Sequence, residues 1–166
     1  MFPRWHNLLG FASGSAGLKG VEQSGAPPLA MKIASDLELY EDLRLIVWRP
    51  RGVLDEAAVN KVLLELLRRE AMAAQPFNRF SDLSLVESFH LTFKYVFHVA
   101  LHRRLSYAGR EPVKSAFYVT HPQAAHTVRI HALMTDHSPL NVEMFEERAA
   151  AAKWLDVPVE SLIFQD

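Results

Sequence analysis

The stretch VKSAFYVTHPQAAHTVRIHALMTDHSPLNVEMFEERAAAAKWL, residues 113–155, alternates strand-like and helix-like segments almost without interruption. It predicts a strand at Val113 to Val119, a helix at Thr120 to Met134, a strand at Asn141 to Phe145 and a helix at Glu146 to Leu155. Parallel neighbouring strands need a connection long enough to hold a helix, so this alternation predicts a parallel sheet. The first of these strands is almost entirely apolar or aromatic, which is typical of a central strand covered on both faces.

The residues before this stretch continue the same pattern. Leu37 to Tyr40 and Leu43 to Trp48 predict the two strands of a hairpin, because the acidic pair Glu41-Asp42 separates two apolar runs. Asp55 is predicted to cap a helix, since its side chain can accept hydrogen bonds from the free amides of the first turn. Apolar residues at helical spacing then indicate one packed face: Val59, Val62, Leu63 and Leu66.

Three further signals complete the predicted order of elements. Phe80 to Leu85 has the pattern of a third strand, followed by a turn around Glu87-Ser88. Thr120 and Gln123 have the spacing of a capping box, in which each side chain bonds a backbone amide of the other residue. A second helix is indicated by the apolar residues Phe93, Val96, Phe97 and Ala100.

These segments predict a single α/β domain at residues 31–166, with a mixed, mostly parallel five-stranded sheet and about four helices, entered by an antiparallel hairpin. Residues 1–30 are predicted to be a flexible extension or a misassigned start, because Gly, Ser, Ala and Pro dominate between Gly10 and Pro28 and Met31 follows. A secretory signal is the alternative, since Arg4 precedes a short apolar stretch, although polar residues interrupt that stretch.

The composition restricts the class of protein. With 166 residues, of which 49% are hydrophobic, the chain is long and apolar enough to fill one core. A formal net charge of -1 gives no reason to expect nucleic acid as a partner. The absence of cysteine excludes disulfides and thiolate chemistry and agrees with a cytoplasmic protein. No apolar run approaches the roughly 18–20 residues that a membrane span requires.

Four stretches of this sequence resemble the SpoIIAA-like branch of the STAS domain superfamily, small bacterial α/β proteins related to anti-sigma-factor antagonists. The resemblance extends over about residues 37–155 and is most specific at the end, where a strand finishing in Phe meets a helix finishing in Trp-Leu. It implies a regulatory or protein-binding module. The stretches are LIVWRPRGVL at 45–54, FSDLS at 80–84, SAFYVT at 115–120 and VEMFEERAAAAKWL at 142–155.

The resemblance also implies a phosphoacceptor, because a partner kinase phosphorylates a serine of STAS-type antagonists at the start of the helix after the Asp-Leu-Ser strand. That register falls near Thr92, in a stretch HLTF that lacks the family's acidic residue and glycine. A simple helix cap is the alternative function for this threonine. The candidate phosphoacceptors and partner-surface residues are Thr92, Ser88, Ser84, Asp82 and His90.

A second implication is an apolar ligand, because SpoIIAA-like proteins are similar in fold to the CRAL-TRIO lipid-transfer domains. Tyr95, Phe97 and Leu101 of the predicted second helix are the candidate lining of such a pocket. Ordinary core packing is the alternative, since a small α/β domain must bury large side chains in any case.

The histidines and the basic residues form no recognisable metal-binding or catalytic motif in the sequence. His98 and His102 lie four apart on a predicted helix, but Val99 stands where a zinc motif has Glu, and no third ligand is identifiable. We expect surface or cap positions for His121, His126, His131 and His137. We expect solvated charges at Arg49, Arg51, Arg79, Arg103, Arg104, Arg110 and Lys114.

The sequence as a whole predicts a non-enzymatic STAS-like regulatory or protein-binding module, with phosphorylation control, no cofactor, no metal and no nucleic acid. Its expected partner is a protein that binds near Glu87 to Phe93, and a homodimer through an exposed sheet edge is left open. A small apolar-ligand or lipid-binding protein is the alternative.

Overall fold

The computed structural model describes residues 28–163 and has the predicted α/β architecture. The prediction for residues 1–30 therefore lies almost wholly outside the described residues. Among those described, a mixed six-stranded sheet is accompanied by a separate two-stranded sheet. No helix in this part of the chain is long and apolar enough to cross a membrane.

The main sheet has the strand order β1-β2-β3-β5-β7-β8. β1, β2 and β3 pair antiparallel, and β3, β5, β7 and β8 pair parallel. The predicted entry hairpin is thus confirmed. The strands are β1 (Met31–Ala34), β2 (Leu37–Tyr40), β3 (Leu45–Trp48), β5 (Asn78–Asp82), β7 (Val113–Tyr118) and β8 (Leu140–Phe145).

Two differences from the predicted sheet have physical causes. β1 is a sixth strand that the sequence pattern missed, because it is a partly exposed edge strand without a continuous apolar face. β7 is covered on both faces as expected, but it lies between β5 and the edge strand β8 rather than at the centre.

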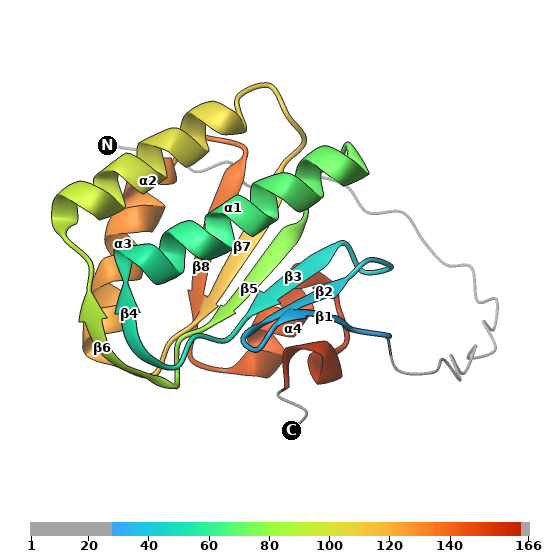
Figure 1. Cartoon of the computed structure of the whole chain (residues 1–166), viewed down its shortest axis with the longest axis horizontal. Coiled ribbons are helices and arrows are strands. Elements are labelled where there is room, and N and C mark those ends of the chain that lie inside the picture. The colour runs from blue at the N-terminus through green and yellow to red at the C-terminus, as the bar shows by residue number, and fades with distance from the viewer. Residues whose placement is uncertain (1–27, 164–166) are drawn as a thin grey trace, which may run out of the picture.

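Helices cover both faces of the main sheet (Figure 1). α1, α2 and α3 lie on one face, and α4 with the short 3-10 helix η1 lies on the other. Their bounds are α1 (Glu56–Ala73), α2 (Phe93–Ser106), α3 (Pro122–Thr135), α4 (Arg148–Leu155) and η1 (Val159–Leu162).

Alternation along the strands divides the core into two layers. In β3, Ile46 and Trp48 join the apolar cluster beneath α1 and α3, whereas Leu45 and Val47 join the cluster beneath α4. Successive side chains of a strand point to opposite faces, so a strand covered on both sides must be apolar throughout. The run LIVW meets that requirement, and all four of its residues are buried.

The turn predicted around Glu87-Ser88 is wrong. Those residues belong to β6 (Val86–His90), which pairs in parallel with β4 (Gly52–Asp55) outside the main sheet. Helix α1 and strand β5 lie between these two strands in the sequence, so the paired residues are more than thirty positions apart. A local pattern of five residues with mixed polarity gives no sign of it.

The predicted cap at Asp55 is confirmed, and the predicted cap at Thr120 is wrong. The Asp55 side chain accepts a hydrogen bond from the Ala58 amide at 2.8 Å, as expected. At α3 the cap is His121, whose Nδ1 accepts from the Gln123 amide, and Thr120 lies before the helix. Pro122 occupies the first turn, where its missing N–H loses no partner.

Candidate functional site

A cavity of about 140 Å³ lies between the main sheet and the three helices that cover one of its faces. Its walls come from elements that are far apart in the chain, including β3, β5, β7 and all three helices. Most of the lining is aliphatic or aromatic. The apolar lining includes Ile46, Trp48, Leu54, Val62, Leu66, Leu83, Phe89, Val99, Phe117 and Val128.

The α2 helix presents one face to this cavity. Tyr95, Val99 and Arg103 line it at a spacing of four residues, which places them on one side of the helix. Of the three residues predicted to line an apolar pocket, Tyr95 therefore does so. Phe97 and Leu101 do not, because each lies two residues from Val99 and so about half a turn away around the helix.

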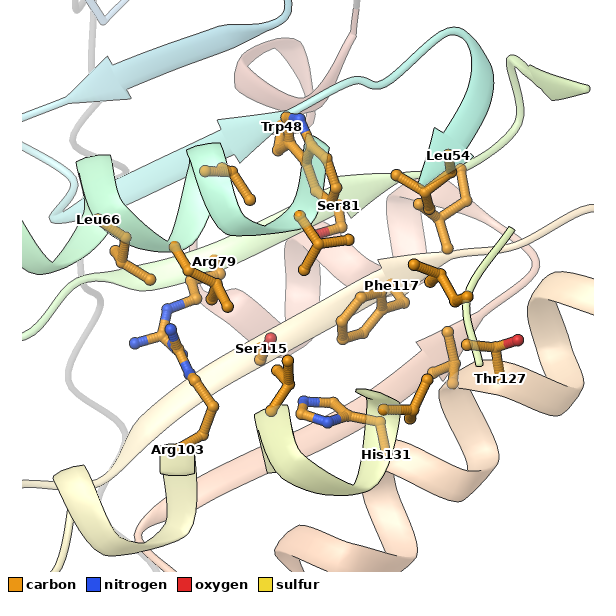
Figure 2. Close-up of a pocket in the computed structure, with 18 of the residues that line it drawn as sticks. Trp48, Leu54, Leu66, Arg79, Ser81, Arg103, Ser115, Phe117, Thr127 and His131 are labelled. Carbon is orange, nitrogen blue, oxygen red and sulfur yellow. The ribbon is translucent and has the colours of Figure 1, made fainter. Parts of the chain in front are cut away.

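One end of the cavity is polar and carries two buried arginines. Arg79 on β5 is 7% exposed and Arg103 on α2 is 4% exposed. Figure 2 shows their guanidinium groups at the same end of the cavity, with Ser115 and His131 beside them. The Tyr107 ring lies next to both cations, at 4.9 Å from the Arg79 guanidinium carbon and 5.2 Å from that of Arg103.

Arg79 has a buried carboxylate as its partner. Its Nη2 lies 3.0 Å from Oε1 of Glu70, whose side chain is 2% exposed near the end of α1. The Tyr107 hydroxyl accepts from Arg79 Nη2 and donates to Glu70. Burial raises the pKa of this tyrosine, so the phenol is neutral at neutral pH. Arg79 Nε is buried and has no hydrogen-bond partner among residues 28–163.

Arg103 has no such partner: no carboxylate within residues 28–163 forms an ion pair with it. Its contact with Tyr107 is a cation–π interaction, worth about 0.5–2 kcal/mol. Burial of an ion costs several kcal/mol, so the aromatic ring compensates only part of that cost. The polar end of the cavity therefore has two cations and one carboxylate.

His131 on α3 lies close to these arginines and lines the same cavity. Burial, followed by the charge of Arg79, lowers its pKa to about 4, so the imidazole is neutral at pH 7. Its ring packs edge-on against Phe117, with the ring centroids 6.1 Å apart. A neutral imidazole can donate or accept one hydrogen bond at each nitrogen without adding charge.

Sequence reasoning missed this polar cluster. We expected solvated charges at Arg49, Arg79 and Arg103, and a surface or cap position for His131, yet these arginines are buried and His131 lines the cavity. Arg49 serves another region, where it pairs with Glu38 at 2.8 Å. The sequence did contain a signal for the burial of Arg103. This residue lies one helical turn beyond Val99, on the apolar face formed by Val96, Val99 and Ala100.

A second polar cluster lies at the carboxyl end of β5. Asp82 is 3% exposed, and its carboxylate accepts from Ser84 Oγ at 2.6 Å and from Arg148 Nη2 at 2.9 Å. The Arg148 guanidinium also lies over the Tyr118 ring, 4.1 Å from its centroid. Asp82 is therefore ion-paired and fully engaged, which suits a structural connection between β5 and α4.

The other candidate partner-surface residues lie along β6 and the start of α2. Ser88 is half-buried, and His90 is exposed at the end of the strand. Thr92 is the exposed N-cap of α2, and its Oγ1 accepts from the Tyr95 amide at 3.1 Å. The same hydroxyl donates to Glu56 at 3.0 Å, which places a carboxylate beside the predicted phosphoacceptor.

The predicted helix pair His98 and His102 is exposed. Across residues 28–163, no group of three or more His, Cys, Asp or Glu side chains has an arrangement that would hold a metal ion. His121 caps α3, and His126 and His137 are exposed.

Comparison with known proteins identifies the architecture. No family model and no curated protein matches the sequence. Among solved structures, the chain is similar to an uncharacterized DUF3478-family protein from Shewanella loihica PV-4 that is described as having a SpoIIAA-like fold. The two are 17% identical with a TM-score of 0.50, over 80% of this chain and 99% of the other. The chain has a SpoIIAA-like fold.

The resemblance predicted from the sequence is thus confirmed at the level of the fold. In this SpoIIAA-like chain, Asp82 lies at the carboxyl edge of the parallel strands, where open α/β sheets commonly place their sites. The cavity lies instead under the helices on one face of the sheet. The cavity and the Asp82 cluster are therefore two separate regions of the molecule.

Proposed function

We propose that this protein is a non-enzymatic binding module that holds a small, mainly apolar molecule in the cavity between the sheet and α1, α2 and α3. The observation that supports this proposal is the cavity itself. Protein interiors are close-packed, with few voids larger than a water molecule. A space of about 140 Å³ lined mainly by apolar side chains departs from that norm.

The size of the cavity limits the size of the ligand. An engineered apolar cavity of about 150 Å³ binds benzene, whereas pockets for drug-sized ligands measure about 300–1,000 Å³. A cavity of about 140 Å³ therefore suits an apolar body of one aromatic ring or a short aliphatic chain.

A neutral one-ring probe tests this proposal. We expect phenylacetamide to shift the NMR signals of cavity residues on titration, and we expect Val99→Phe to weaken its binding because the added ring occupies the cavity. Val53→Phe makes the same change on an exposed β4 residue outside the cavity, so it should leave the affinity unaltered.

The probe experiment also has an outcome that contradicts the proposal. Titration of wild-type protein with phenylacetamide and with its charged analogue phenylacetate, without shifts in any cavity residue, together with bare protein in native mass spectrometry after gentle purification, would show that the cavity is not a binding site. Signals that shift equally in the Val99→Phe protein would place the probe elsewhere.

A protein-binding module under phosphorylation control is the second candidate. Its support is the exposure of the Thr92 hydroxyl at the N-terminus of α2, where free amides and the helix dipole stabilise phosphate. The Glu56 carboxylate, 3.0 Å from that hydroxyl, opposes it by like-charge repulsion. This repulsion weighs against phosphate on Thr92, so ligand binding remains the first proposal.

Phosphopeptide mapping tests the second candidate. Protein purified from its own host should contain phosphate on Thr92, and Glu56→Gln should increase the phosphorylated fraction because it removes the repelling charge. Glu87→Gln, a neutral change at an exposed β6 residue, is the matched control. A peptide covering Thr92 that is unmodified in every preparation would contradict this function.

A further inference from the structure

We infer, on the basis of the proposed ligand-binding function, that the ligand is a monocarboxylate whose apolar body fills the cavity and whose carboxylate lies between the guanidinium groups of Arg79 and Arg103. The two arginines line the cavity from different elements and converge at one end of it (Figure 2). The rest of the lining is mainly apolar, so the molecule that fits is amphipathic.

The charge balance of the polar end determines the charge of the ligand. Arg79 and Arg103 contribute two positive charges, and Glu70 contributes one negative charge. Tyr107 and His131 are neutral at pH 7, as their pKa shifts require. Among the described residues, one positive charge that lines the cavity is left without a counterion, and a monoanion neutralises it. Arg110 also lies near the Tyr107 ring, at 5.8 Å, but it is exposed to solvent and does not line the cavity. A phosphate dianion would leave an excess of negative charge in the same buried space.

The hydrogen-bonding groups determine the chemical type of the anion. A guanidinium presents a planar fork of donors that matches a carboxylate in two parallel hydrogen bonds. Arg79 Nε is buried and without a partner, so part of its donor capacity is unused. The Ser115 hydroxyl and the His131 imidazole lie at the same end and can supply further hydrogen bonds.

Affinity for a carboxylate and its matched amide tests this inference. Phenylacetate and phenylacetamide have the same apolar body and differ in the charge at the polar end. We expect isothermal titration calorimetry to show roughly tenfold to hundredfold tighter binding of phenylacetate, the range typical of hydrogen bonds to a charged group. Phenyl phosphate, which has a similar apolar body and is mainly a dianion at pH 7, should bind more weakly than phenylacetate.

Removal of the Arg103 charge tests whether this residue causes the preference for the carboxylate over the amide. Arg103→Met keeps a long, flexible side chain without charge, and we expect it to abolish the preference for phenylacetate while phenylacetamide still binds. Arg104→Met makes the same change on the next residue of α2, which is exposed and outside the cavity, and should retain the preference. Circular dichroism reports whether both variants are folded.

The outcomes separate this inference from the function on which it rests. Equal affinity of wild-type protein for phenylacetate and phenylacetamide would overturn the monocarboxylate and leave the ligand-binding function intact. Tighter binding of phenyl phosphate than of phenylacetate would replace the carboxylate by a phosphate-type anion. No binding of any probe would overturn the proposed function itself. These comparisons use wild-type protein, so they hold even when a variant fails to fold.

Discussion

Replacement of Glu70 by glutamine is expected to lower the free energy of unfolding by about 3–5 kcal/mol, the cost of leaving a buried ion without its partner. The Glu70 side chain is 2% exposed and lies 3.0 Å from Arg79. It also accepts hydrogen bonds from the Tyr107 hydroxyl and the Phe77 amide. The variant keeps the shape of the side chain and removes its charge, so two buried cations remain without any carboxylate.

The matched control lies five residues earlier on the same helix. Glu65 pairs with Arg69 at 2.8 Å and with Arg68 at 3.7 Å, and all three side chains are more exposed than Glu70. Because water screens such pairs, Glu65→Gln should cost less than about 1 kcal/mol. Urea denaturation at pH 7 measures both changes. Equal losses in the two variants would contradict a special role for the buried pair.

Acid is expected to destabilise the protein through His131 by on the order of 3 kcal/mol, from the difference between its folded and unfolded pKa values. The folded pKa is about 4, below the ordinary value of 6.5. Between these two pH values the unfolded chain binds a proton that the folded protein does not. The stabilisation is therefore complete above pH 6.5, falls as the pH drops, and is lost by pH 4.

Comparison of two histidine variants isolates this effect from other titrating groups. His131→Gln should reduce the loss of unfolding free energy between pH 6.5 and pH 4, even if the variant is less stable than wild type at every pH. His126→Gln, at an exposed position on the same helix, should leave the pH dependence unchanged. Parallel stability curves for His131→Gln and wild type would show that His131 is not the acid-sensitive group.

The order of helices and strands was predictable because it depends on local physics. Strands such as LIVW at 45–48 are apolar throughout since both faces are covered. Helix α1 is predicted by the helical spacing of its apolar residues after a capping aspartate. These signals involve residues within a few positions of one another. The same signals also carried the resemblance that the fold comparison confirmed.

Elements with weak local signals were missed or misread. Met31–Ala34 pairs at a sheet edge, where one side of the strand faces solvent and no continuous apolar run is needed. Val86–His90 is a strand because β4 pairs with it, and the partner is more than thirty residues away. The cap of α3 is His121 and not the predicted Thr120, because the backbone path decides which side chain reaches the free amides.

The candidate site was predictable only in part. Of the residues selected for an apolar ligand, Tyr95 lines the cavity, whereas Phe97 and Leu101 lie on another side of the helix. The polar end was not foreseen, because arginine in a sequence predicts solvent exposure unless its partners are known. Those partners, Glu70 and Tyr107, lie 9 and 28 positions from Arg79.

The sequence by itself determined the α/β class, the entry hairpin and the succession of parallel strands and helices, because periodicity and caps act between near neighbours. Only the tertiary structure decided which charges are buried. Whether Arg79 and Arg103 meet water or an apolar cavity depends on how α1, α2 and β5 pack together. Electrostatic free energy depends on distance in space and on burial, and sequence spacing specifies neither for residues on separate elements.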